Sequence, residues 1–91
     1  MAMLDDVKIA LRVSHTMLDG EINDLIAAAR QDLLLSGVVS LKANSSTDPL
    51  VKRAVTSYVK AYIGYDNPDY ERLVMAYEKL KMHLTLSGDY S

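Results

Sequence analysis

The most regular pattern of apolar and polar positions lies between Asp19 and Ser36. Its apolar side chains recur at the spacing i, i+3, i+4 and i+7, which places them on one side of an α-helix. They are Ile22, Leu25, Ile26, Ala29 and Leu33. Asp19 is a suitable N-cap residue, and Gly37 stands where helices often end in a left-handed residue. We therefore predict a helix over residues 19–36.

The segment from Leu4 to Val13 also predicts a helix, with Asp5 and Asp6 in its first turn, where carboxylates favour the helix dipole. Apolar residues lie on two sides of it. Leu4, Val7 and Leu11 share one side, and Ile9 and Val13 project from roughly the opposite side. This helix is therefore either sandwiched between neighbours or leaves apolar surface in contact with solvent.

Two later helices are predicted to begin with a capping residue followed by proline. Asp48-Pro49 starts a helix that ends near Gly64, and Asn67-Pro68-Asp69 starts one that continues to about Leu84 or Leu86. Residues 38–47 break the helical pattern and predict a loop, with a short extended piece at 38–41 as the alternative. Residues 85–91 predict a flexible tail.

These elements predict an all-α fold, a compact bundle of four main helices with a longer loop between the second and third. The chain has 91 residues, of which 49% are apolar and 24% charged, and this balance is typical of a globular chain. A chain of that length forms a single domain over 1–91, and we expect its core within about residues 3–84.

Apolar side chains outside the helical stripes are too numerous for a monomeric bundle of this size to hide. They are Ile9, Val13, Leu34, Leu35, Ile63, Met75 and Met82. All six aromatic residues are tyrosine. Tyrosine is common at protein interfaces and at the margins of cores, so Tyr65 and Tyr70 are candidates for a partner surface, with an edge-of-core role as the alternative. We predict that copies of the chain or other proteins cover part of this surface.

The chain lacks the motifs of common enzymes and metal sites. It has no cysteine, its four glycines stand singly, and its two histidines, His15 and His83, are far apart in sequence. We expect no catalytic activity, no cofactor, no metal and no small-molecule substrate. No apolar run is long enough to span a membrane, and the first residues lack the basic stretch of a signal peptide, so we expect synthesis in the cytoplasm.

The formal net charge of −2 argues against a dedicated nucleic-acid-binding protein, because phosphate contacts require a basic face. One candidate face exists on the predicted helix that begins at Pro49, and it consists of Lys52, Arg53 and Lys60. A small helical regulatory or DNA-binding module that uses this face is therefore the alternative to a structural subunit.

Three runs of sequence carry a resemblance to a known family. They are Leu4-Asp5-Asp6-Val7-Lys8-Ile9-Ala10-Leu11-Arg12-Val13, then Asp19-Gly20-Glu21-Ile22-Asn23-Asp24-Leu25-Ile26-Ala27-Ala28-Ala29-Arg30, then Asp48-Pro49-Leu50-Val51-Lys52-Arg53-Ala54-Val55. Over about residues 3–84 the order of these elements resembles the small head-tail connector proteins, also called head completion or adaptor proteins, of tailed bacteriophages and prophages.

The resemblance implies a virion protein at the head-tail junction that forms a homo-oligomeric ring of about twelve copies. Such a ring joins the portal protein to the next tail-proximal connector protein, and DNA passes through it without specific recognition. By the same resemblance, the loop 38–47 and the tail 85–91 are candidate portal-contact or lumen segments. Their candidate residues are Val38, Leu41, Lys42, Asn44, Asp89 and Tyr90.

Overall fold

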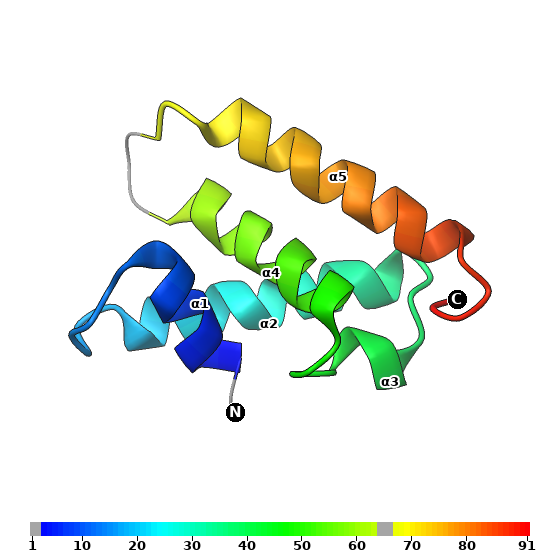
Figure 1. Ribbon diagram of the computed structural model, residues 1–91, viewed down its shortest axis with the longest axis horizontal. Helices are drawn as coiled ribbons and strands as arrows, with labels where there is room; N and C mark the ends of the chain where they lie inside the picture. The colour runs from blue at the N-terminus through cyan, green and yellow to red at the C-terminus, as the bar shows by residue number, and fades with distance from the viewer. Residues whose placement is uncertain (1–2, 64–66) are drawn as a thin grey trace.

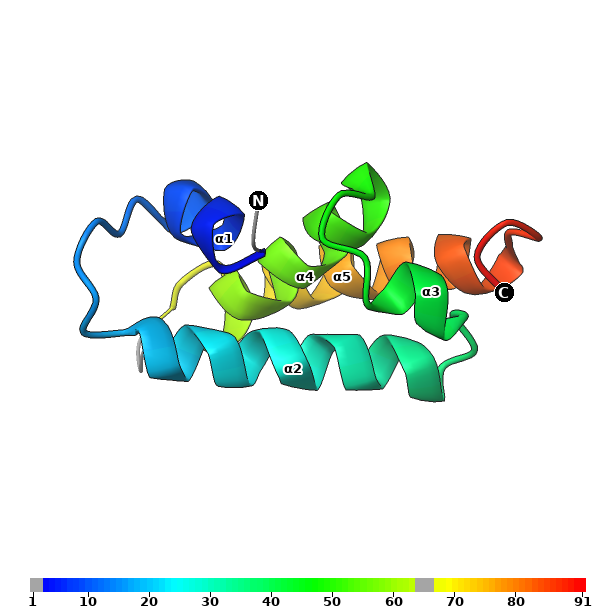
Figure 2. The ribbon, with the colours of Figure 1, turned by 90° about the horizontal axis from the view of Figure 1, so that it is seen from below.

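The computed structural model describes residues 3–63 and 67–91, and every regular element in these ranges is a helix. In chain order the helices are α1 (Met3–Leu11), α2 (Asp19–Leu35), α3 (Ser40–Ala43), α4 (Pro49–Tyr62) and α5 (Tyr70–Leu86). α4 contacts α1, α2 and α5, and it runs antiparallel to α5 beside it (Figure 1). Turned by 90°, the molecule shows α2 along one side with α1 and α3 against it (Figure 2). The predicted all-α bundle is confirmed.

The core is entirely apolar in the described residues and is centred on α4. Val51, Ala54, Val55 and Val59 of α4 have no exposed surface. They meet buried side chains of the neighbouring segments, which are Val7, Ile22, Ala29, Leu33, Val38, Tyr77 and Leu84. Small side chains on α4 let its neighbours approach closely, and each buried aliphatic side chain contributes about 1.5–3 kcal/mol of hydrophobic free energy.

α4 begins as its sequence predicts. The Asp48 side chain accepts hydrogen bonds from the backbone N–H groups of Leu50 at 3.0 Å and Val51 at 3.1 Å, and Pro49 occupies the first turn. The two N–H groups would otherwise lack partners at the helix start. The predicted end near Gly64 lies outside the described residues, and the described helix ends at Tyr62.

The starts of α2 and α5 differ from the predicted ones. Leu18, not Asp19, is the N-cap of α2, because the Asp19 carboxylate instead pairs with Lys8 of α1 at 2.7 Å. α5 starts at Tyr70, two residues after the predicted proline position. Asn67 accounts for this shift: its side-chain oxygen accepts the Asp69 N–H at 3.0 Å, and its amide donates to the Lys60 carbonyl of α4 at 2.6 Å. The capping side chain thus forms the turn between α4 and α5.

α1 and α2 both end in left-handed residues. α1 stops at Leu11, two residues earlier than predicted, because Arg12 adopts φ 60° and the Val13 N–H bonds back to the Lys8 carbonyl at 3.0 Å. Gly37 has φ 112° after the end of α2, which confirms its predicted role.

The segment predicted as a loop over 38–47 contains the one-turn helix α3. Arg30 of α2 holds this segment, because its guanidinium donates to the carbonyl oxygens of Ala43 at 2.8 Å and Ser45 at 2.9 Å. Val38 and Ala43 are buried beneath it. The prediction of a loop was incomplete because a single helical turn is too short to show a periodic pattern.

The Asp48 cap predicts a specific loss of stability. The substitution Asp48→Ala removes the acceptor of two backbone N–H groups and of the Tyr90 hydroxyl, and it should lower the free energy of unfolding by at least about 1–2 kcal/mol. The measurement is urea unfolding followed by circular dichroism. Asp69→Ala is the matched control, because Asp69 is the N-cap of α5 but its side chain accepts no capping hydrogen bond. A loss as large in Asp69→Ala as in Asp48→Ala would contradict this assignment.

Candidate interaction surfaces

The structure places the predicted off-stripe apolar residues in two groups. Ile9, Leu35, Met75 and Met82 are exposed, with 60–78% of their surface accessible, and Tyr70 is 42% exposed. Val13, Leu34 and Ile63 are half-buried. Tyr65 lies outside the described residues. A partner role for these side chains remains a prediction, but four of them are available to a partner.

One end of the molecule carries a group of exposed apolar side chains, which we call the apolar end. Its residues are Leu35, Val39, Leu41 and Leu86, with exposures from 42% to 82%. They come from the end of α2, from α3 with the residue before it, and from the end of α5, which lie together at the same end of the molecule in both views (Figures 1 and 2). Of these four residues, the helical stripes predicted Leu35 alone, because the other three lie in segments too short or too terminal to form a stripe.

A small apolar notch lies where the first two helices and the end of α4 meet. Leu11, Val13, Leu18 and Ile63 line it together with Glu21, around a volume of about 260 Å³. Two predicted partner residues, Val13 and Ile63, are therefore brought together, although 50 positions separate them in the chain. Their half-buried state follows from this contact.

Two residues of the predicted portal-contact segments are placed differently from the expectation. Val38 is only 2% exposed and belongs to the core, so it cannot meet a partner while the fold is intact. Tyr90, expected in a flexible tail, is fixed against the middle of the chain. Its hydroxyl donates to the Asp48 carboxylate at 2.9 Å, and its carbonyl accepts the Val39 N–H at 2.7 Å. We call this contact the tail clasp.

The tail clasp includes a cation as well. The Lys42 ammonium group lies 5.0 Å from the centre of the Tyr90 ring and 3.6 Å from the Asp48 carboxylate. A cation over an aromatic face and beside a carboxylate is favourable in both contacts. Leu41, Asn44 and Asp89 remain exposed, so these three candidate contact residues are available to a partner.

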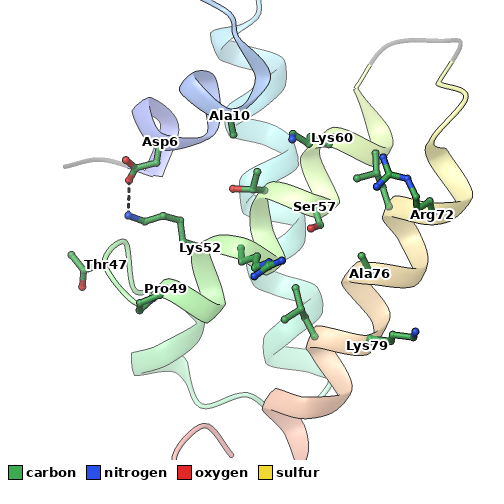
Figure 3. Close-up of a pocket in the computed structure, with 14 residues that line it drawn as sticks. Asp6, Ala10, Thr47, Pro49, Lys52, Ser57, Lys60, Arg72, Ala76 and Lys79 are labelled. Atoms are coloured by element: carbon green, nitrogen blue, oxygen red, sulfur yellow. Dashed lines mark ion pairs between the residues drawn. The ribbon is translucent and has the colours of Figure 1, made fainter.

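A wide groove lies along α4, between α1 on one side and α5 on the other, and faces away from α2; we call it the basic groove (Figure 3). It has a volume of about 760 Å³. Five basic side chains line it, and they are Lys52, Arg53, Lys60, Arg72 and Lys79. The chain has ten lysine and arginine residues in total, so half of them lie here, with Asp6 as the one acidic lining residue.

Residues between the basic side chains of the groove are small or apolar. They are Ala10, Pro49, Thr56, Ser57, Leu73, Ala76 and Leu80. Lys52 pairs with Asp6 at 3.3 Å, and Arg72 pairs with Asp69 at 3.3 Å. Arg53 and Lys79 form no ion pair within the described ranges 3–63 and 67–91. The α4 half of this surface was predicted from the sequence, but Arg72 and Lys79 were not, because the pairing of α4 with α5 brings them there.

A third polar cluster joins α2 to α5. The Tyr77 hydroxyl donates to Asp32 at 2.6 Å, and the Lys81 ammonium group lies 3.1 Å from the same carboxylate. Burial raises the pKa of Asp32, but the hydrogen bonds from Tyr77 and Lys81 and the charge of Lys81 outweigh it, so the pKa lies below its ordinary value. Burial and the bond to Asp32 raise the pKa of Tyr77 well above its ordinary value. The arrangement is structural, because each group is held in its ordinary charge state at neutral pH.

No group of three or more histidine, aspartate or glutamate residues that could hold a metal ion occurs among residues 3–63 and 67–91. In the same part of the chain, none of the helices combines the length and hydropathy needed to cross a lipid bilayer.

Comparison with known proteins identifies the family. The chain matches the family described as "Phage connector protein" over residues 3–91, and it belongs to that family. This is a family of structural proteins of the phage particle, which contact other head and tail proteins. No curated protein and no solved structure shows a significant match.

Two partly buried carboxylates, Asp32 and Asp48, predict how stability depends on pH. Burial raises the pKa of Asp48 as well, but the N–H groups of Val51 and Leu50, the Tyr90 hydroxyl and Lys42 lower it further, so the pKa is depressed in the folded chain. Between the folded and unfolded pKa values the unfolded chain binds more protons. Stability should therefore be constant above pH of about 5 and fall as the pH drops through about 4 and below.

The measurement is the midpoint of urea unfolding between neutral pH and pH of about 2.5, compared with Asp32→Asn and Asp48→Asn. Each substitution should reduce the loss of stability at acidic pH, and the double variant should reduce it most. Tyr77→Phe should reduce it by part of the Asp32→Asn effect. If both single variants lose as much stability at acidic pH as the wild-type chain does, other groups control acid unfolding.

Proposed function

We propose that this protein is a ring-forming subunit of a phage or prophage head-tail connector. About twelve copies form a ring that joins the portal protein to the tail-proximal connector protein, and the DNA passes through its central hole. The protein is then located at the head-tail junction of the virion. Membership of the connector family carries this proposal.

The apolar end of the molecule supports the proposal. Leu35, Leu41 and Leu86 are each at least 78% exposed, and they gather at one end instead of being scattered over the surface. Exposed apolar side chains that gather in one region are typical of a surface that is covered in an assembly. We assign the apolar end to contact with another connector component, together with the nearby candidates Lys42, Asn44 and Asp89.

The net charge of −2 also suits a ring through which DNA moves, since a strongly basic hole would hold the phosphates. The second candidate function, a small regulatory or DNA-binding module, is favoured by the basic groove, which adds Arg72 and Lys79 to the predicted face of Lys52, Arg53 and Lys60. The two functions differ in a measurable way. A DNA-binding module should bind a short DNA duplex with an affinity that falls steeply as the salt concentration rises, and charge reversal of these five residues should abolish the binding. A connector subunit without DNA-binding function should show neither effect.

The main test is made in the phage that encodes the chain. Loss of the gene should give DNA-filled heads and separate tails, seen by electron microscopy, and a plasmid copy should restore joined particles. Leu35→Asp with Leu41→Asp should fail to restore them, although its free energy of unfolding should change by about 0.5 kcal/mol or less because both positions are exposed.

Met17→Asp is the control, because Met17 is 87% exposed but lies in the turn between α1 and α2, far from the apolar end. This variant should restore joined particles. Joined particles in the absence of the gene would overturn the proposed function, whereas full activity of the double variant would overturn only the role of the apolar end.

A further inference from the structure

The basic groove has the composition of a site for a helix with acidic flanks. Its lining combines small and apolar side chains of α5, which are Leu73, Ala76 and Leu80, with the cations Arg53 and Lys79. A surface that binds a phosphate backbone needs cations throughout, and stacking of single-stranded bases needs aromatic side chains, which are absent from the lining. Helices dock in grooves through a central apolar stripe with complementary charges beside it. A protein helix therefore fits the groove better than a nucleic acid.

The outer face of α2 has the complementary composition. α2 carries four carboxylates and one basic residue, Arg30, which is turned inward to the carbonyls of the α3 segment. Asp19 and Asp32 are already paired within the chain. Glu21 and Asp24 are exposed on the outside.

The same outer face is also nearly flat. Gly20, Ala27 and Ala28 are small and exposed, and Gln31 is the longest side chain in the middle of this stripe. Small residues permit a short distance between helix axes, which lets the flanking carboxylates reach the walls of a groove. The exposed stripe from Gly20 to Leu35 is about 22 Å long, and the α4 wall of the groove from Pro49 to Lys60 is about 17 Å long.

The basic groove and the outer face of α2 point in opposite directions. α4 turns Val55 and Val59 toward the core, where α2 packs, and turns Arg53 and Lys60 toward the groove. The side of α2 that packs on the core carries Ile26 and Leu33, whereas Asp24, Ala27 and Ala28 are exposed on its other side. The α2 face of a chain therefore cannot enter the basic groove of the same chain. It can enter the groove of a second copy only in a head-to-tail arrangement, in which two different surfaces meet.

We propose that the outer face of α2 from one copy docks in the basic groove of the next copy. The contact joins two different faces, so repetition closes a ring when the rotation per subunit divides a full turn. Arg53 and Lys79 of one copy then face Glu21 and Asp24 of its neighbour. The inference rests on the proposed function, since it names the surfaces through which the ring forms.

Cross-linking between introduced cysteines tests the contact directly, because the native chain contains no cysteine. Ser57→Cys places a thiol in the groove, and Ala27→Cys places one on the outer face of α2. Equal amounts of the two variants, treated with a short bismaleimide at rising protein concentration, should give a mixed dimer. A chain with both substitutions should give a ladder of covalent oligomers.

Ser14→Cys is the control, since Ser14 is exposed in the turn after α1 and belongs to neither surface. The yield of dimer with Ser57→Cys should be about tenfold lower for Ser14→Cys than for Ala27→Cys. Equal yields, or no dimer with Ala27→Cys at any concentration, would overturn the proposal. If light scattering shows that the wild-type chain self-associates but Ser57→Cys and Ala27→Cys give no cross-link, this contact is rejected. The proposed function would remain intact.

Charge reversal on the two surfaces is a second test of the contact. Arg53→Glu with Lys79→Glu in the groove copy should reduce the mixed dimer about tenfold, and Glu21→Lys with Asp24→Lys in the α2 copy should restore it. Glu71→Lys, a charge change of the same sign on an exposed residue of α5 outside the groove, should restore nothing. If groove reversal leaves the cross-link unchanged but abolishes binding of a duplex in a gel shift, the occupant is nucleic acid and the proposal is wrong.

Discussion

The packing of α4 against three other helices is the constraint on which the rest of the structure depends. α1, α2 and α5 all contact α4, and the small side chains of its buried side, such as Ala54 and Val55, set how close they come. Because the buried core residues described are apolar apart from the Tyr77 hydroxyl, which bonds to Asp32, stability of the core rests on apolar contact and on polar contacts at its edges. The opposite side of α4 is left to solvent and carries the basic side chains. A single amphipathic helix thus organises the interior and one functional surface.

Much of this fold could be predicted from the sequence, because long amphipathic helices with clear starts show themselves in local patterns. The stripe of α2, the Asp48-Pro49 start of α4 and the left-handed Gly37 all follow from local chemistry. The errors occurred where a side chain found a distant partner. Asp19 pairs with Lys8 instead of capping α2, and Tyr90 bonds to Asp48 across 42 residues instead of remaining in a flexible tail.

The candidate surfaces also divide into features that local sequence patterns predict and features that only the folded chain brings together. Exposure of Ile9, Leu35, Met75 and Met82 could be predicted, since a residue on the wrong side of a helical stripe has no core to enter. The basic groove and the apolar end could not, because each is assembled from segments far apart in the chain. Arg72 and Lys79 become part of one surface with Arg53 only when α5 folds back along α4. Val38 gave the opposite error, since the short apolar run Val38, Val39 and Leu41 gives no local sign that Val38 is buried while the other two are exposed.

The tail clasp has a consequence for local opening of the fold. The last turn of a terminal helix usually frays on its own, and surface segments such as 38–48 also open independently. Here the Tyr90 carbonyl is bonded to Val39 and its hydroxyl to Asp48, so the segment that follows α5 and the α3 segment are fastened to each other. Release of either segment from the other exposes backbone amides in both of them. The end of the chain and its middle therefore behave as one cooperative unit, whose opening would change the shape of the apolar end in a single step.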